Sequence, residues 1–283
     1  MEIKFIYTDK KKLFEITPIS SSITEYFSPL KYFGNYEKKT CQTINQFTSI
    51  FPDLKDIIDT SDVIIFDLMN ELEIPKKLNE YFNYIEEFLK NSEKVNSNEI
   101  KDIKVKIYDY VMEKLYDKLF PDEPDENDLL ILRNCYKASW VELKHLIKGK
   151  DDYILENFIP DTNIYFQQII EEKSPRKKLL NMKKIFNCII NLGLLNGDKI
   201  EGTDETLSLL NYAFIKNKPL SIFTNCKYMK LFIGNKKNLE DGHQLSQLIG
   251  ICQQMLNFNY KCLIGITEEE FNKNCDSVYL EEK

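Results

Sequence analysis

The sequence predicts an all-α protein. Apolar residues recur at steps of three and four positions from about residue 51 to residue 275, which is the spacing of one face of an α-helix. The chain holds only nine glycines and nine prolines, few for a protein of short strands and tight turns. With 43% hydrophobic residues over 283 positions, it can fill a sizeable core in one large domain or two modest ones.

The first fifty residues follow a different pattern. Met1, Ile3, Phe5 and Tyr7 alternate with other residues, and a run of three serines with two prolines excludes a long helix here. We predict that residues 1–50 form an N-terminal arm, partly extended, that docks on the main body or stays loose.

Three helices are expected next. The first carries an apolar stripe over residues 54–72 and ends at Pro75, and the second covers residues 78–89. The third begins near Ser97 and runs to Leu119, before a proline. Together with the helices that follow, they predict an α-helical, bundle-like fold.

The second part of the chain, residues 105–283, is also predicted to be helical. Ser174 followed by Pro175 predicts the start of a long helix, and Thr267 with Glu270 predicts a capping box before a last short helix. Asp161 can cap another helix. The remaining helices are expected over residues 129–136, 140–147, 164–170, 204–217, 220–233 and 240–256.

Composition narrows the class of partner. The formal net charge of −7 provides no basic face, so no nucleic acid is expected to bind. The longest apolar runs are too short to cross a bilayer, so no direct membrane insertion is expected. The seven cysteines form no CxxC motif and no secretory signal precedes them, which predicts reduced thiols in the cytoplasm. The two histidines lack zinc-site spacing, so no metal is expected.

No motif for covalent catalysis is present. The sequence lacks a phosphate-binding glycine loop, HExxH, GxSxG and the kinase signatures, and its paired acids lie beside polar positions, as on solvated helix faces. Ordinary catalysis on a small molecule therefore has little support in the sequence.

The informative stretch begins at Thr203 as TDETLSLLNYAFIK and continues with KP from Lys218, TNCKYM from Thr224 and LEDGH from Leu239. This series resembles the vacuolar-protein-sorting-nine exchange domain, the domain of Rabex and related activators of early-endosomal Rab GTPases. The family pattern has an acid at a helix start, Leu-Pro-x-Leu-x-Tyr, Ile/Leu-Lys, a proline, Ser-Asn-x-x-Tyr-Ile and Gly-Glu-x-Gly-Tyr, in the same order and spacing. The resemblance covers about residues 105 to 275, and residues 51–104 are similar to the helical bundle that precedes the domain in Rabex.

The resemblance implies a helical bundle packed on a layered all-helical exchange domain, with a groove for the switch regions of a GTPase. The acidic finger of the family corresponds to Asp204, although an acid there would also complement the helix dipole, as Glu205 would. The implied GTPase-binding positions are Ser208, Tyr212, Asn225, His243 and Ser246. Of these, Tyr212 also fits a core or groove-wall role, and Asn225 the holding of a loop.

Three positions depart from the family pattern. Ser208 stands at the family proline, His243 at a tyrosine and Ser246 at a threonine. The expected activity is guanine nucleotide exchange on an early-endosomal, Rab-five-subfamily GTPase in endocytic vesicle trafficking. The chain itself needs no cofactor, because Mg²⁺ and GDP or GTP belong to the partner. We expect a cytoplasmic monomer recruited peripherally to endosomal membranes. The alternatives are a catalytically weak Rab-binding module and a helical scaffold.

Overall fold

The all-α prediction is confirmed by the computed structural model. The structure describes residues 6–8, 11–13, 74–91, 97–121, 125–148, 158–195, 203–232 and 239–281. Apart from a short antiparallel hairpin of β1 (Ile6–Thr8) and β2 (Lys11–Leu13), the regular elements in these ranges are helices. None of the described helices is long and apolar enough to cross a membrane.

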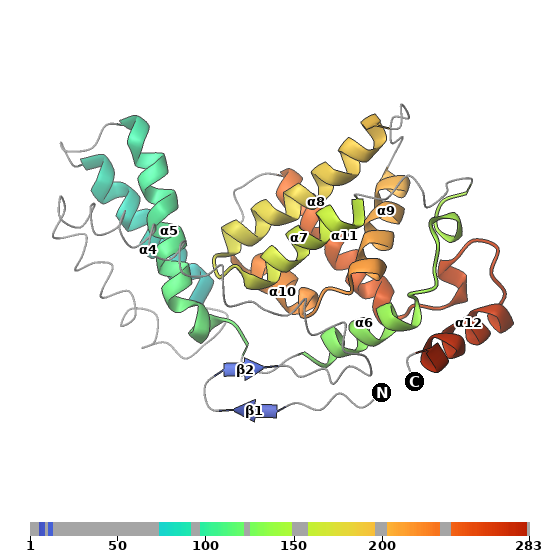
Figure 1. The fold of residues 1–283 in the computed structure, drawn as a ribbon. Coiled ribbons are helices and arrows are strands. Elements are labelled where there is room, and N and C mark those ends of the chain that lie inside the picture. Colours follow the sequence, from blue (N-terminus) through green and yellow to red (C-terminus); the bar gives the residue numbers. More distant parts are fainter. Residues whose placement is uncertain are drawn as a thin grey trace.

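The helices α4 (Ile74–Asn91) and α5 (Ser97–Leu119) pack side by side at one end of the molecule (Figure 1). Pro75 lies in the first turn of α4, where its missing N–H removes no helical hydrogen bond. The helix predicted over residues 54–72 lies outside the described residues. The two helices bury facing apolar residues at helical spacing: Leu78, Tyr81, Phe82, Ile85 and Leu89 from α4, and Ile103, Ile107, Val111, Met112 and Leu115 from α5.

The other helices form a layered domain. These are α6 (Glu126–Lys137), α7 (Phe158–Glu171), α8 (Pro175–Leu195), α9 (Thr203–Asn217), α10 (Ile222–Phe232), α11 (Leu239–Leu256) and α12 (Glu268–Glu281), with 3₁₀ turns η2 (Leu143–His145) and η4 (Tyr260–Cys262). The helices α7 and α8 make the most extensive pair, and α12 lies at the end opposite to α4 and α5 (Figure 1). One continuous core joins α6 to α11.

Several predicted helix ends are confirmed. The helix α8 begins at Pro175, and the Thr267 N–H and hydroxyl both donate to a Glu270 carboxylate oxygen at 2.9 Å, as in a capping box. The hydroxyl of Ser174, however, donates to Asp109 at 2.6 Å. Asp161 lies inside the first turn of α7, because that helix begins three residues earlier, at Phe158.

The helix predicted over residues 140–147 is wrong. This segment is an irregular turn around η2, and the Glu142 N–H donates to the His145 ring at 3.0 Å. The turn leaves the His145 carbonyl free to accept the Ile264 N–H at 2.8 Å. A regular helix would use that carbonyl internally, so the long-range hydrogen bond outweighs the local apolar spacing.

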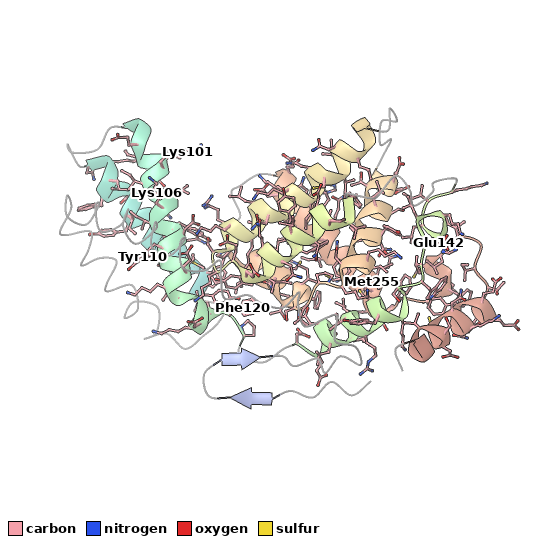
Figure 2. The ribbon with its side chains drawn as sticks, in the orientation of Figure 1. Lys101, Lys106, Tyr110, Phe120, Glu142 and Met255 are labelled. Carbon is pink, nitrogen blue, oxygen red and sulfur yellow. The ribbon has the colours of Figure 1, made fainter. Side chains whose placement is uncertain are left out.

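The helix α5 also contacts the layered domain. Asp109 accepts hydrogen bonds from Ser174 and Arg176, and Glu113 pairs with Lys177 one turn further along α5. Two aromatic residues of α10, Tyr228 and Phe232, pack into the apolar cluster of α4 and α5. Phe120 lies just past the end of α5 (Figure 2), and its ring packs against the ring of Tyr228 in α10. The predicted boundary between residues 104 and 105 falls within α5, and the division of the chain into domains stays a prediction.

Candidate functional site

The first turn of α9 carries the predicted acidic finger. Asp204 is exposed, and no other described residue forms a hydrogen bond or ion pair with it. Glu205 follows it in the same turn and is half-buried. Both acids complement the helix dipole, which favours helix formation at this point. The carboxylate of Asp204, exposed and unpaired among the residues that the structure describes, is available to a partner molecule.

The residues that follow Asp204 at four-residue steps run from the surface into the core. Ser208 is half-buried, and Tyr212 is buried at 4% exposure. The Lys216 ammonium lies 5.2 Å from the centroid of the Tyr212 ring. Since Tyr212 is covered, its position favours the groove-wall role over direct contact with a partner.

The first half of α11 presents two of the predicted contact residues. His243 and Ser246 are exposed and three residues apart, so they lie on one face of the helix. The Ser246 hydroxyl donates to the Gly242 carbonyl at 2.7 Å. The opposite face buries Leu245 and Leu248, and α11 packs against both α8 and α9.

Asn225 lies inside the protein. Its side chain is 1% exposed, its carbonyl oxygen accepts a hydrogen bond from the Lys178 ammonium at 2.6 Å, and its amide donates to the Ser221 carbonyl at 2.8 Å. Ser221 has a positive φ of 56°, a conformation that non-glycine residues rarely adopt. These bonds favour the predicted loop-holding role of Asn225 over contact with a partner.

The structure also shows a buried lysine that the sequence analysis missed. Lys178 of α8 is fully buried, and its ammonium donates to the carbonyl of Ile169 at 2.7 Å, in the last turn of α7. The rings of Tyr116 and Phe120 lie 5.3 and 5.6 Å from it. Burial lowers the pKa of Lys178 to about 7. The carbonyl at the helix end and the aromatic faces both favour a cation, which offsets part of the cost of burial.

The sequence analysis also missed Asp128, a buried residue of α6 whose carboxylate lies at the start of α10. Asp128 accepts hydrogen bonds from the N–H groups of Phe223 and Thr224 at 2.8 and 3.1 Å, and from the Thr224 hydroxyl at 2.5 Å. It therefore caps α10 from α6, 95 residues away in sequence. Its one signal in the sequence is its place at the end of the acidic run Asp122–Asp128.

The predicted site residues divide into exposed and buried ones. Among the described residues, no group of three His, Cys, Asp or Glu side chains could hold a metal ion. The exposed predicted residues lie in the first turn of α9 and the first half of α11, whereas Tyr212 and Asn225 are buried behind them. The prediction that the chain needs no cofactor of its own remains untested.

Comparison with known proteins identifies the central region. Residues 160–259 match the family model of the Vacuolar sorting protein 9 (VPS9) domain, which confirms the resemblance found in the sequence. This range runs from the first turn of α7 to just past the end of α11 and contains all the predicted site residues. The match lies inside the range of about 105 to 275 over which the sequence resembles this family.

Two curated proteins are similar over a longer segment. Vacuolar protein sorting-associated protein 9A of Arabidopsis thaliana is 23% identical over 182 residues, which cover 59% of this chain and 34% of that protein. The protein of the same name from Oryza sativa subsp. japonica is 24% identical over 136 residues, 44% of this chain and 27% of its own length. The chain thus spans about a third of the length of these relatives.

Proposed function

Because residues 160–259 match the VPS9 domain, a domain of Rab guanine nucleotide exchange factors, we propose that the chain promotes GDP release from a small Rab GTPase. The partner is a member of the early-endosomal, Rab-five subfamily. The chain acts as a regulator in endocytic vesicle trafficking and is recruited peripherally to endosomal membranes. It carries out no covalent chemistry.

The observation that carries the proposal is the state of Asp204. Its carboxylate is exposed at the start of α9 and is unpaired among the described residues, at the position of the family's acidic finger. Asp128 and Asp109, by contrast, are buried and are held by hydrogen bonds within the chain. Asp204 therefore remains available for an electrostatic contact outside the chain.

The physical effect of the carboxylate follows from how a GTPase holds its nucleotide. A lysine and Mg²⁺ of the GTPase site neutralise the phosphates of GDP. A carboxylate that enters this pocket offers the lysine another anion, repels the phosphates and disturbs the metal site. Nucleotide affinity then falls, and by linkage bound nucleotide weakens the grip of the exchange factor by the same factor. The direction of exchange is set by the nucleotide in excess.

The contact surface is completed by the exposed face of α11 and by the next turn of α9. His243 and Ser246 contact the GTPase from α11, and Ser208 does so from α9. Tyr212 and Asn225 support these helices from below the surface, since both are buried. Ser208 gives the start of α9 less rigidity than the family proline. A weak binder of Rab GTPases is the alternative that these departures favour.

The test is release of labelled GDP from a panel of purified Rab GTPases. Wild-type chain should accelerate release from the early-endosomal members, and Asp204→Ala should remove most of that acceleration. Glu205→Ala is the matched control, because it removes an acid from the same helix turn and the same dipole interaction.

The results separate the candidate functions. Equal losses for Asp204→Ala and Glu205→Ala would assign both acids to the helix dipole and contradict the finger. Binding of a Rab without accelerated release would support the weak binding module. Circular dichroism of each variant checks that the helices remain folded.

A further inference from the structure

The first turn of α11 precedes the predicted contact residues His243 and Ser246. Further along the helix, Leu245 and Leu248 are buried. Glu240, in the first turn, is exposed. The Asp241 carboxylate, in the same turn, forms an ion pair with Lys183 of α8 and so joins this turn to another helix.

This ion pair is largely shielded from water. The Lys183 ammonium lies 2.5 Å from a buried Asp241 carboxylate oxygen, and the two side chains are 29% and 17% exposed. The two atoms meet as an ion pair without the angle of an aligned hydrogen bond. By contrast, the surface pair Lys144–Glu142 has side-chain exposures of 54% and 48%. Shielded charges are screened less by salt, and removal of either partner leaves the other one uncompensated.

The position of Asp241 connects the ion pair to the exposed face of α11. Gly242 and His243 follow it directly, and the Gly242 carbonyl accepts the hydroxyl of Ser246 at 2.7 Å. A displacement of the first turn would therefore carry His243 with it and disturb the Ser246 hydroxyl. An acid that only complements the helix dipole could stay in water. Asp241 instead points to α8.

We propose that Lys183 and Asp241 are positioning residues of the exchange site: their ion pair holds the first turn of α11 on α8 and sets where His243 and Ser246 meet the GTPase. This inference rests on the proposed exchange function. Loss of the ion pair should therefore weaken binding of the GTPase. Asp204 acts from α9 and is left in place, so the maximal exchange rate at saturating chain should not change.

The first measurement requires no GTPase. Backbone hydrogen–deuterium exchange in a peptide over residues 239–248 should be faster in Asp241→Asn and in Lys183→Met than in wild type, because each variant removes the ion pair between Lys183 and Asp241. Lys184→Met is the matched control. Its ammonium bonds Asn181 of the same helix and lies 5.2 Å from the ring of Tyr165 on α7, so its loss should leave that peptide unchanged.

The second measurement separates binding from catalysis. In a titration of GDP release from the Rab that responds best to wild type, both single variants should raise the half-saturating concentration about three- to tenfold with an unchanged maximal rate. Asp204→Ala should instead lower the maximal rate. The variant Asp241→Lys places a like charge beside Lys183 and should also raise the half-saturating concentration. Adding Lys183→Asp restores an ion pair of reversed polarity and should bring that concentration most of the way back to the wild-type value.

The outcomes are distinct. Unchanged deuterium exchange together with an unchanged half-saturating concentration would overturn the inference, as would a double variant no better than Asp241→Lys. If the wild-type chain accelerates GDP release from none of the Rab GTPases tested, the proposed function is wrong. The deuterium exchange then decides by itself whether the pair holds the turn. Equal thermal midpoints of the variants and wild type would show that the effects are local.

Discussion

Lys178 allows the energetic cost of a buried charge to be measured in this protein. Its pKa is lowered to about 7 by burial in the folded chain, against 10.5 for a lysine in water. Above pH 7 the folded chain releases this proton, while the unfolded chain keeps it until about pH 10.5. The unfolded state then binds more protons, so the free energy of unfolding rises with pH in this window.

The expected size can be worked out. Between pH 6.5 and pH 8.5, Lys178 should add about 2 kcal/mol to the free energy of unfolding of the wild type. Lys178→Met, which cannot titrate, should lack this increase. The substitution also leaves the Ile169 carbonyl and the Asn225 side chain without their donor, at about 1–3 kcal/mol for each unpaired acceptor. Loss of the buried charge offsets part of this cost.

The assay is urea unfolding followed by the fluorescence of Trp140, the single tryptophan, at half-unit steps from pH 6.5 to 8.5. Lys177→Met is the control. The Glu113 carboxylate raises the pKa of Lys177 against the effect of burial, so this lysine is charged in both states throughout the window. Its loss should leave the slope with pH unchanged. Parallel slopes for wild type and Lys178→Met would refute the reasoning.

Three further predictions concern the site and the fold. His243→Tyr restores the family residue at an exposed position and should raise exchange efficiency about ten- to a hundredfold on an early-endosomal Rab, measured by GDP release; an unchanged rate would place His243 outside the contact. A fragment of residues 97–283 lacks α4 and exposes the face of α5 that contains Ile107 and Val111, so it should bind a hydrophobic dye and lose solubility; a soluble monomer of wild-type stability would contradict this. Asp128→Ala removes the cap of α10 and should lower the free energy of unfolding by about 2–4 kcal/mol in the urea assay; a loss no larger than that of the exposed Glu126→Ala would show that the cap contributes little.

The sequence by itself predicted the helical class and the position of most helices. The spacing of apolar residues is a local property, and the starts of helices depend on nearby residues such as Pro175 and the Thr267–Glu270 capping box. The family resemblance also came from local motifs between residues 203 and 243. The irregular turn at 140–147 was missed because its decisive hydrogen bond comes from Ile264, more than a hundred residues away.

Tertiary structure decided which of the predicted site residues face water. Asp204 and His243 are exposed, whereas Tyr212 and Asn225 are buried. All four are polar residues within helices, so residue type and local structure alone do not separate them. Tertiary structure also decided the partners of Lys178, whose surroundings combine α5, α7 and α10. A charged side chain can be buried only where distant segments supply acceptors together. Their meeting depends on helix packing, which no local spacing encodes.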